Sequence, residues 1–370
     1  MEIIMDRVYN FSSGPSMLPA EIIESLNEAI SSYNGTGMSV MELSRESREY
    51  HEIFSSAEKL LRELMNIPEG YKVLFMSGAS DLQYSAIPLN LLSDHKCADY
   101  IISGRLSKNA SLEAKKYGDI AIAASSAGAT PSFSTVPETK RSHFRPDADY
   151  VHICFNNIVY GTKFHYIPDT GNIPLVADMS SFLLSEPIEV PKFALIYANA
   201  ECGIGASGLT VLIVRDDLTT GTLTDAPTHL NYKYAGESEG EFNMAPVWSV
   251  YVAKLVFEWI ASLGGLEEMK RRNERKASVI YDYLDSQTYY TAPVDKKCRS
   301  MMNVVFVTGD AALDKMFAIE ARSAGLENLS GHSSVGGMCA SIYNAMPIEG
   351  VEKLVAFMKK FAQENPKLDA

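Results

Sequence analysis

The stretch Ala194–Val214 reads ALIYANAECGIGASGLTVLIV, two apolar runs joined by a segment of small residues. The runs, Ala194–Ala198 and Leu209–Val214, are five and six residues long and rich in Ile, Leu and Val. Continuous apolar runs of this length are typical of strands that are buried on both faces of a sheet. The stretch therefore predicts two inner strands of a sheet that is covered by helices, with a short link between them.

Five more runs of the same kind come earlier in the chain: Val73–Met76, Tyr100–Ser103, Ile120–Ala123, Tyr150–Cys154 and Leu175–Asp178. Helical patterns accompany them. One is Ser107–Tyr117, and another is Ala20–Ile30, which places its apolar residues on one face. Alternation of strands and helices predicts an α/β fold with a mainly parallel sheet covered on both faces.

The character of the chain changes near residue 250. Two long helical patterns, Val247–Leu263 and Leu266–Leu284, are separated by two glycines. A strand pattern at Met302–Val307 and helical patterns at Ala312–Ala324 and Ile348–Gln363 follow. We therefore expect a large α/β domain over residues 15–250, and a smaller α+β domain built from residues 1–14 and 251–370.

Composition excludes several classes of function. The chain has 370 residues and a formal net charge of −13, which would repel a phosphate backbone, so we expect no nucleic-acid partner. No stretch approaches the roughly 18 apolar residues of a membrane span, so we expect no membrane partner. The five cysteines are scattered and have no CxxC spacing, which is typical of reduced thiols and predicts a cytoplasmic protein without a structural metal.

The order of local motifs resembles the phosphoserine aminotransferase family, which belongs to class V of the fold-type-I pyridoxal-phosphate enzymes. The resemblance implies a homodimer with active sites at the subunit interface, pyridoxal phosphate as cofactor, and amino transfer between glutamate and 3-phosphohydroxypyruvate. The segments that carry it span nearly the whole chain: Asn10–Pro19, Gly37–Ser44, Leu60–Pro68, Ile87–Leu92, Asn156–Thr162, Ala177–Ser181, Gly208–Leu218, Gly264–Asp285, Ser300–Phe306 and Gly331–Pro347.

The resemblance fails at the residue on which the chemistry depends. The family has its Schiff-base lysine in a segment of the form Ala-Gln-Lys-Asn-x-Gly, which here reads Ala200-Glu201-Cys202-Gly203-Ile204-Gly205. The flanking runs match without gaps, so the lysine position is Cys202. A thiol cannot form a stable imine with an aldehyde, and we expect no covalently bound cofactor.

Most of the other positions implied to hold the cofactor are also altered. Asp178 matches the family's partner of the pyridinium nitrogen and is retained. Altered positions are Ser80 and Asp81 in the phosphate loop, Leu106 in place of the ring-stacking Trp, Ile158 and Phe182 near the ring, Glu201 beside the lysine position, and Asn243 and Met244 in the segment that reaches the second subunit's phosphate. Asp81 would place a negative charge where a phosphate is expected.

The positions implied to hold the substrate's carboxylate and phosphate are altered as well. Arg45 and Glu46 stand where the family has His-Arg, His332 and Ser333 stand where it has a second His-Arg, and Cys339 stands at a third arginine. Three arginine positions are therefore empty, and Glu46 inverts the charge of one. Arginine is the usual bidentate partner of carboxylates and phosphates, so recognition of a phosphorylated keto acid should be lost.

Three functional hypotheses remain open. The first is a non-catalytic homologue that serves as a binding, regulatory or structural protein. The second is an enzyme, or a ligand or metal binder, with different chemistry in the same cleft, which holds Cys154, Cys202, Cys339, Glu46, Asp178 and Glu201. The third is residual phosphoserine:2-oxoglutarate aminotransferase activity.

Overall fold

A seven-stranded sheet forms the centre of the larger part of the molecule in the computed structural model, which describes residues 7–93, 95–219, 226–237 and 245–367. Its strands lie in the spatial order β2 (Tyr71–Ser77), β10 (Leu209–Arg215), β9 (Leu195–Asn199), β8 (Leu175–Asp178), β5 (Tyr150–Cys154), β3 (Cys97–Ile102) and β4 (Asp119–Ser125). The pairs from β9 to β4 are parallel, whereas β10 is antiparallel to both β2 and β9. The prediction of a mainly parallel sheet is confirmed.

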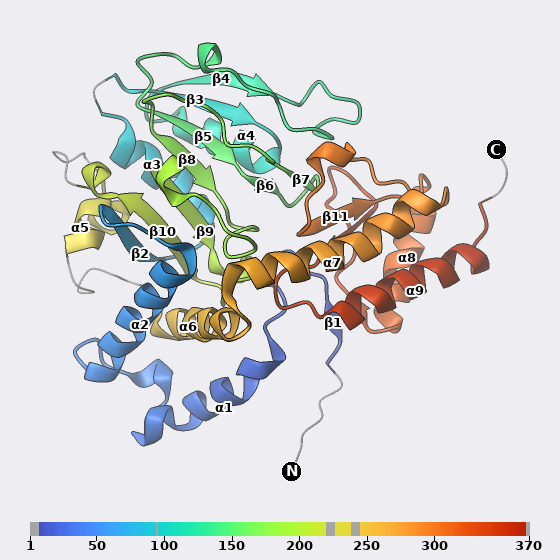
Figure 1. The fold of residues 1–370 in the computed structure, drawn as a ribbon, viewed down its shortest axis with the longest axis horizontal. Coiled ribbons are helices and arrows are strands. Elements are labelled where there is room, and N and C mark those ends of the chain that lie inside the picture. The colour runs from blue at the N-terminus through green and yellow to red at the C-terminus, as the bar shows by residue number, and fades with distance from the viewer. Residues whose placement is uncertain (1–6, 94, 220–225, 238–244, 368–370) are drawn as a thin grey trace.

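Helices cover both faces of this sheet (Figure 1). One face packs against α1 (Ile23–Ser32), α2 (Arg48–Met65) and α6 (Val247–Ser262), and the other against α3 (Gln83–Leu91), α4 (Arg105–Ala114) and α5 (Tyr232–Glu237). Strand β10 shows the reason for its apolar sequence: Val211 and Ile213 enter the first core, and Leu212 and Val214 enter the second. Successive side chains point to opposite faces, so a strand with two covered faces must be apolar throughout.

The C-terminal part has a core of its own. It contains α7 (Gly265–Ser286), α8 (Ala311–Ser323), α9 (Ile348–Glu364) and an antiparallel pair of strands, β11 (Asn303–Phe306) and β13 (Met338–Ser341). The N-terminal strand β1 (Tyr9–Asn10) pairs with β12 (Leu326–Glu327), and Phe11 joins this core. A small hairpin, β6 (Asn156–Asn157) with β7 (Thr162–Lys163), lies between the two parts.

The described residues contain no single helix that is long and apolar enough to cross a membrane. Only α6 and α7 taken together pass a test of length and composition, and the two are bent by 86° at their junction.

Candidate active site

Cys202 lies in the link between two antiparallel neighbours of the sheet. Strand β9 ends at Asn199, a short 3₁₀ turn covers Ala200–Cys202, and β10 pairs back onto β9 with Thr210 opposite Asn199. Gly203 follows with a φ of +117°, a left-handed conformation that side chains rarely adopt. Because strand pairing fixes both ends of the link, the position of Cys202 is set by the framework.

The surroundings of Cys202 are tight and carry negative charge. The side chain is 7% exposed, and a Cβ added to Gly14 would lie 3.4 Å from its Sγ. Burial raises the pKa of the Cys202 thiol well above its usual range, and the charges of Glu201 and Asp178 raise it further. The thiol is therefore protonated at neutral pH, which argues against a nucleophilic role.

Glu201 is held inside the same link. Its Oε2 accepts a hydrogen bond of 2.5 Å from Ser207 Oγ, and its Oε1 accepts one of 3.2 Å from Asn199 Nδ2. Its carbonyl accepts from the backbone N–H of Ser16, which ties the N-terminal segment to the link. The carboxylate adds negative charge beside Cys202 and supplies no proton acceptor that could ionise the thiol.

Asp178 ends strand β8 and is 2% exposed. Its Oδ1 accepts hydrogen bonds from the backbone N–H of Ser180 at 2.9 Å and from Ser180 Oγ at 2.6 Å. Burial raises the pKa of Asp178 although hydrogen bonds from Ser180 and Tyr197 oppose the shift. A buried carboxylate served only by hydroxyl and amide groups could accept a cationic ring nitrogen, which is the role that the family pattern implies.

Tyr84 of α3 is a site residue that sequence reasoning missed. Burial raises the pKa of its hydroxyl strongly, and the charge of Asp178 raises it further. The packing of α3 thus brings this phenol within electrostatic range of the predicted Asp178. Nothing in the spacing of Tyr84 signals this, because it is set by the packing of α3 on the sheet.

The phosphate loop is closed by its own side chain. Ser80–Leu82 form a 3₁₀ turn before α3, and Asp81 is exposed there. Gly78 has a φ of +97°, and a Cβ at that position would collide with the side chain of Leu82. A phosphate bound at this helix start would meet the like charge of the Asp81 carboxylate and the side chain of Leu82.

The predicted ring-side positions lie beside the β6–β7 hairpin. Leu106 lies in the first turn of α4. The start of this helix is capped by Ser107 Oγ, which accepts hydrogen bonds from the backbone N–H groups of Ser103 and Gly104. A Cβ on Gly104 would collide with Asn157. Ile158 and Cys339 meet, since Cys339 Sγ lies 3.8 Å from the carbonyl of Ile158.

The predicted substrate positions are only partly assembled. His332 Nε2 lies 2.7 Å from Arg105 Nη1, so this contact joins the C-terminal part to the start of α4. Ser333 is exposed in the same loop, and Arg45 and Glu46 are exposed in the turn before α2. Asn243 and Met244 lie outside the described residues.

The two buried lysines of the described chain are committed elsewhere. Lys163 Nζ pairs with Glu186 at 2.8 Å and lies 4.4 Å from the centre of the Phe182 ring. Lys276 Nζ donates to the carbonyls of Ile342 at 3.0 Å and Tyr343 at 2.6 Å. Neither amine is free to take the place of the missing one at Cys202.

The residues present do not fit pyridoxal phosphate as the family holds it. The position at which the resemblance implies covalent attachment holds a buried thiol, the implied phosphate turn carries Asp81 and Leu82, and among these positions Asp178 matches the implied chemistry. A soft-metal site is not formed either. Within the described ranges, no group of three or more His, Cys, Asp or Glu side chains could hold a metal ion.

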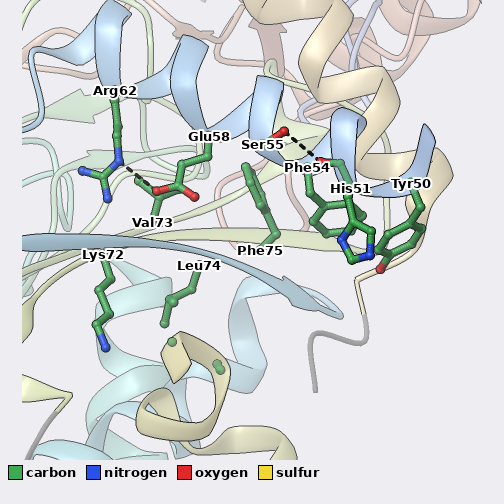
Figure 2. A pocket seen from close by; sticks show the side chains of 12 residues that line it. Tyr50, His51, Phe54, Ser55, Glu58, Arg62, Lys72, Val73, Leu74 and Phe75 are labelled. Atoms are coloured by element: carbon green, nitrogen blue, oxygen red, sulfur yellow. Dashed lines mark hydrogen bonds and ion pairs between the residues drawn. The ribbon is translucent and has the colours of Figure 1, made fainter. Parts of the chain in front are cut away.

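A hollow of about 440 Å³ lies along the edge strand β2, between α2 and α5 (Figure 2). Its arginine, Arg62, already donates to Glu58 and to the carbonyl of Tyr71, each at 2.8 Å. None of the predicted site positions lines this hollow. It is therefore separate from the Cys202 site.

Known proteins resemble the chain over almost its full length. Residues 8–354 match the model of the class-V aminotransferases. A phosphoserine aminotransferase from Bacillus cereus is 46% identical to it, over 98% of this chain and 100% of that protein. A phosphoserine aminotransferase from Listeria monocytogenes is also 46% identical, over 97% of each chain.

Solved structures agree with the sequence relatives. A phosphoserine aminotransferase studied for radiation damage of its Schiff base is 40% identical, with a TM-score of 0.93 over 97% of this chain and 99% of that one. The pyridoxal-phosphate-bound phosphoserine aminotransferase of Trichomonas vaginalis is 34% identical, with a TM-score of 0.89 over 95% of this chain and 100% of that one.

Proposed function

The chain belongs to the phosphoserine aminotransferase family of class-V aminotransferases, and we propose that it is a member that does not catalyse pyridoxal-phosphate-dependent transamination. The observation that carries the proposal is the buried, protonated thiol of Cys202 at the Schiff-base position. Its relatives bear names of active enzymes, so the proposal concerns this chain and not the family.

The chemical reason is that an imine requires an amine. Transamination in this fold uses one lysine both to attach the cofactor and to shuttle protons, and a thiol does neither. The buried lysines Lys163 and Lys276 are hydrogen-bonded to other groups, which supports the absence of a substitute.

The substrate side supports the same conclusion. The three expected arginine positions hold Glu46, Ser333 and Cys339. Losing one charged partner of a bound anion typically costs about 1.5–3 kcal/mol, which is roughly tenfold to a few hundredfold in affinity. A phosphorylated keto acid that lost three such partners would not be held.

We propose a binding, regulatory or structural role for the chain, as a homodimer in the cytoplasm. The dimer is the family expectation, and five free cysteines suit a reducing compartment. Size-exclusion chromatography with light scattering tests the dimer, and a monomeric mass would contradict it.

Residual transaminase activity is the second candidate, and the retained Asp178 favours it. This buried carboxylate has no cationic partner among the described side chains, which leaves it available to a cationic ring. Both candidates can be separated by one set of measurements.

The experiment compares the native chain with Cys202→Lys and with Cys298→Lys, a control at a half-buried cysteine away from the link. Visible spectra are recorded with added pyridoxal phosphate, and each variant is tested for rescue of a serine-auxotrophic strain. We expect no spectral change and no rescue by the native chain, and at most weak cofactor binding by Cys202→Lys. Rescue by the native chain would overturn the proposal, and full activity of Cys202→Lys would show that the wider changes are harmless.

A further inference from the structure

A cavity of about 490 Å³ lies where α7 and α9 begin, and its walls include Trp259, Arg275, Lys276 and Ile348. None of the predicted cofactor or substrate positions lines it. Its volume falls within the range of small-molecule sites, about 300–1,000 Å³. In Figure 1 helix α9 lies beside α7, and residues of both helices line the hollow.

Cations dominate the α7 wall. Arg271 and Arg272 both pair with Glu268, so these charges are largely satisfied. Arg275 has no ion pair or hydrogen bond within the described residues, and it is exposed to the cavity. Lys276 is 3% exposed, and its Nζ is held by backbone carbonyls and by no carboxylate. The charge of Arg275 therefore has no counter-ion among the described side chains, on a chain of formal charge −13.

The start of α9 lies at the same cavity. This 17-residue helix begins after Pro347 without a side-chain cap, and in the described structure the backbone N–H groups of Ile348 and Glu349 have no acceptor. Trp259 lines the cavity with its ring, because its Nε1 is buried and cannot be reached from the open space. The first N–H groups of a helix favour an anion beside them, so this end of the cavity suits a ligand that carries acceptors.

We propose that this cavity binds a small molecule through an oxyanion group, a phosphate or a carboxylate. Arg275 supplies a bidentate partner, and the start of α9 supplies N–H donors. The carboxylates of Glu21 and Glu349 also line the cavity, so a ligand with a single anionic group is favoured over a polyanion. The proposal is independent of whether the Cys202 site is active.

The test uses Trp259 as the reporter, because the chain has only two tryptophans and Trp248→Phe leaves one. Inorganic phosphate and acetate are titrated separately, with sodium chloride of equal ionic strength as the blank. We expect a saturable change in Trp259 fluorescence with phosphate, with acetate or with both. The anion that produces the change identifies the chemical group that the cavity binds. A response no different from the chloride blank in both arms overturns the proposal.

Arg275→Gln is expected to weaken the binding at least tenfold, since it removes the charged partner and keeps a polar side chain. Arg322→Gln, at an exposed arginine of α8, is the matched control and should leave the affinity unchanged. Equal affinity of Arg275→Gln and the parent would refute the assignment. If Trp248→Phe does not fold, calorimetric titration of the native chain gives the same comparison.

Discussion

Arg105 and His332 meet at 2.7 Å between Nη1 and Nε2, and they join the start of α4 to the loop before β13. A guanidinium only donates hydrogen bonds, so Nε2 must accept. The other ring nitrogen, Nδ1, lies 2.8 Å from Ser334 Oγ and 3.1 Å from the backbone nitrogen of Ser334. His332, which the family pattern assigns to substrate, is thus engaged by a neighbouring arginine.

Replacing Arg105 should loosen this junction. In Arg105→Ala, the loop around His332 loses the hydrogen bond that ties it to α4, so proteolysis within residues 331–337 should be faster by several-fold. Limited proteolysis followed by mass spectrometry measures the rate. Arg48→Ala, at an exposed arginine of α2, is the control, and equal rates in the two variants would contradict the prediction.

Cys202 should resist alkylation in the native protein. Burial, Glu201 and Asp178 all raise the pKa of its thiol, so little thiolate is present at neutral pH. We expect iodoacetamide to modify it at least ten times more slowly than the half-buried Cys298, as followed by peptide mass spectrometry. Labelling of both cysteines at the same rate would show that the Cys202 pocket is open.

His152 should make the fold sensitive to acid. Burial lowers its pKa from 6.5 to about 3, so the unfolded chain binds more protons than the folded one between these values. Stability is therefore lost as the pH falls from about 6.5 towards 3, by on the order of a few kcal/mol. His152→Phe keeps an aromatic ring on Tyr100 and removes the titration.

Urea unfolding at several pH values measures this effect. The unfolding free energy of His152→Phe should depend less on pH between 6 and 4 than that of the native chain, even if the variant is less stable overall. His143→Gln, at an exposed histidine, should keep the native dependence. Parallel curves for the native chain and His152→Phe would rule out the buried neutral imidazole.

Lys276 should make the unfolding free energy depend on pH in the alkaline range. Burial lowers its pKa from 10.5 to about 7, so the unfolded chain holds more protons between these values and the unfolding free energy rises with pH there. In Lys276→Met this rise between pH 7 and 10 should shrink. Lys59→Met, at a lysine that is 77% exposed, should retain it, and an unchanged slope in Lys276→Met would contradict the assignment.

Sequence patterns predicted the framework well because buried strands leave a strong signal. The predicted strands Tyr150–Cys154 and Leu175–Asp178 have the observed bounds, and Ala194–Ala198 is displaced by one residue. The helix predicted at Ser107–Tyr117 instead covers Arg105–Ala114, because the Ser107 hydroxyl caps the turn from inside the helix. The 18-residue helix α2 was not predicted, although a motif at its end carries the family resemblance.

The site was harder to predict because its members are brought together by packing. The family resemblance pointed to Cys202 and Asp178 as site positions. The residues that surround them in the structure follow no local sequence pattern that would have identified them. Tyr84 approaches from α3, and Tyr343 contacts Gly203 from the C-terminal part. The antiparallel direction of β10 was also not predicted, because an apolar run does not encode the direction of its neighbours.

The hydrogen bonds of Lys276 have a consequence for the two cavities of the molecule. Lys276 lines the proposed oxyanion cavity, and its amine donates a hydrogen bond to the carbonyl of Tyr343. The side chain of Tyr343 packs against Gly203, the residue that follows Cys202. One residue thus lies in the wall between the proposed oxyanion cavity and the segment that holds Cys202. A substitution at Lys276 would therefore alter the packing of Tyr343 on Gly203 as well as the lining of the cavity.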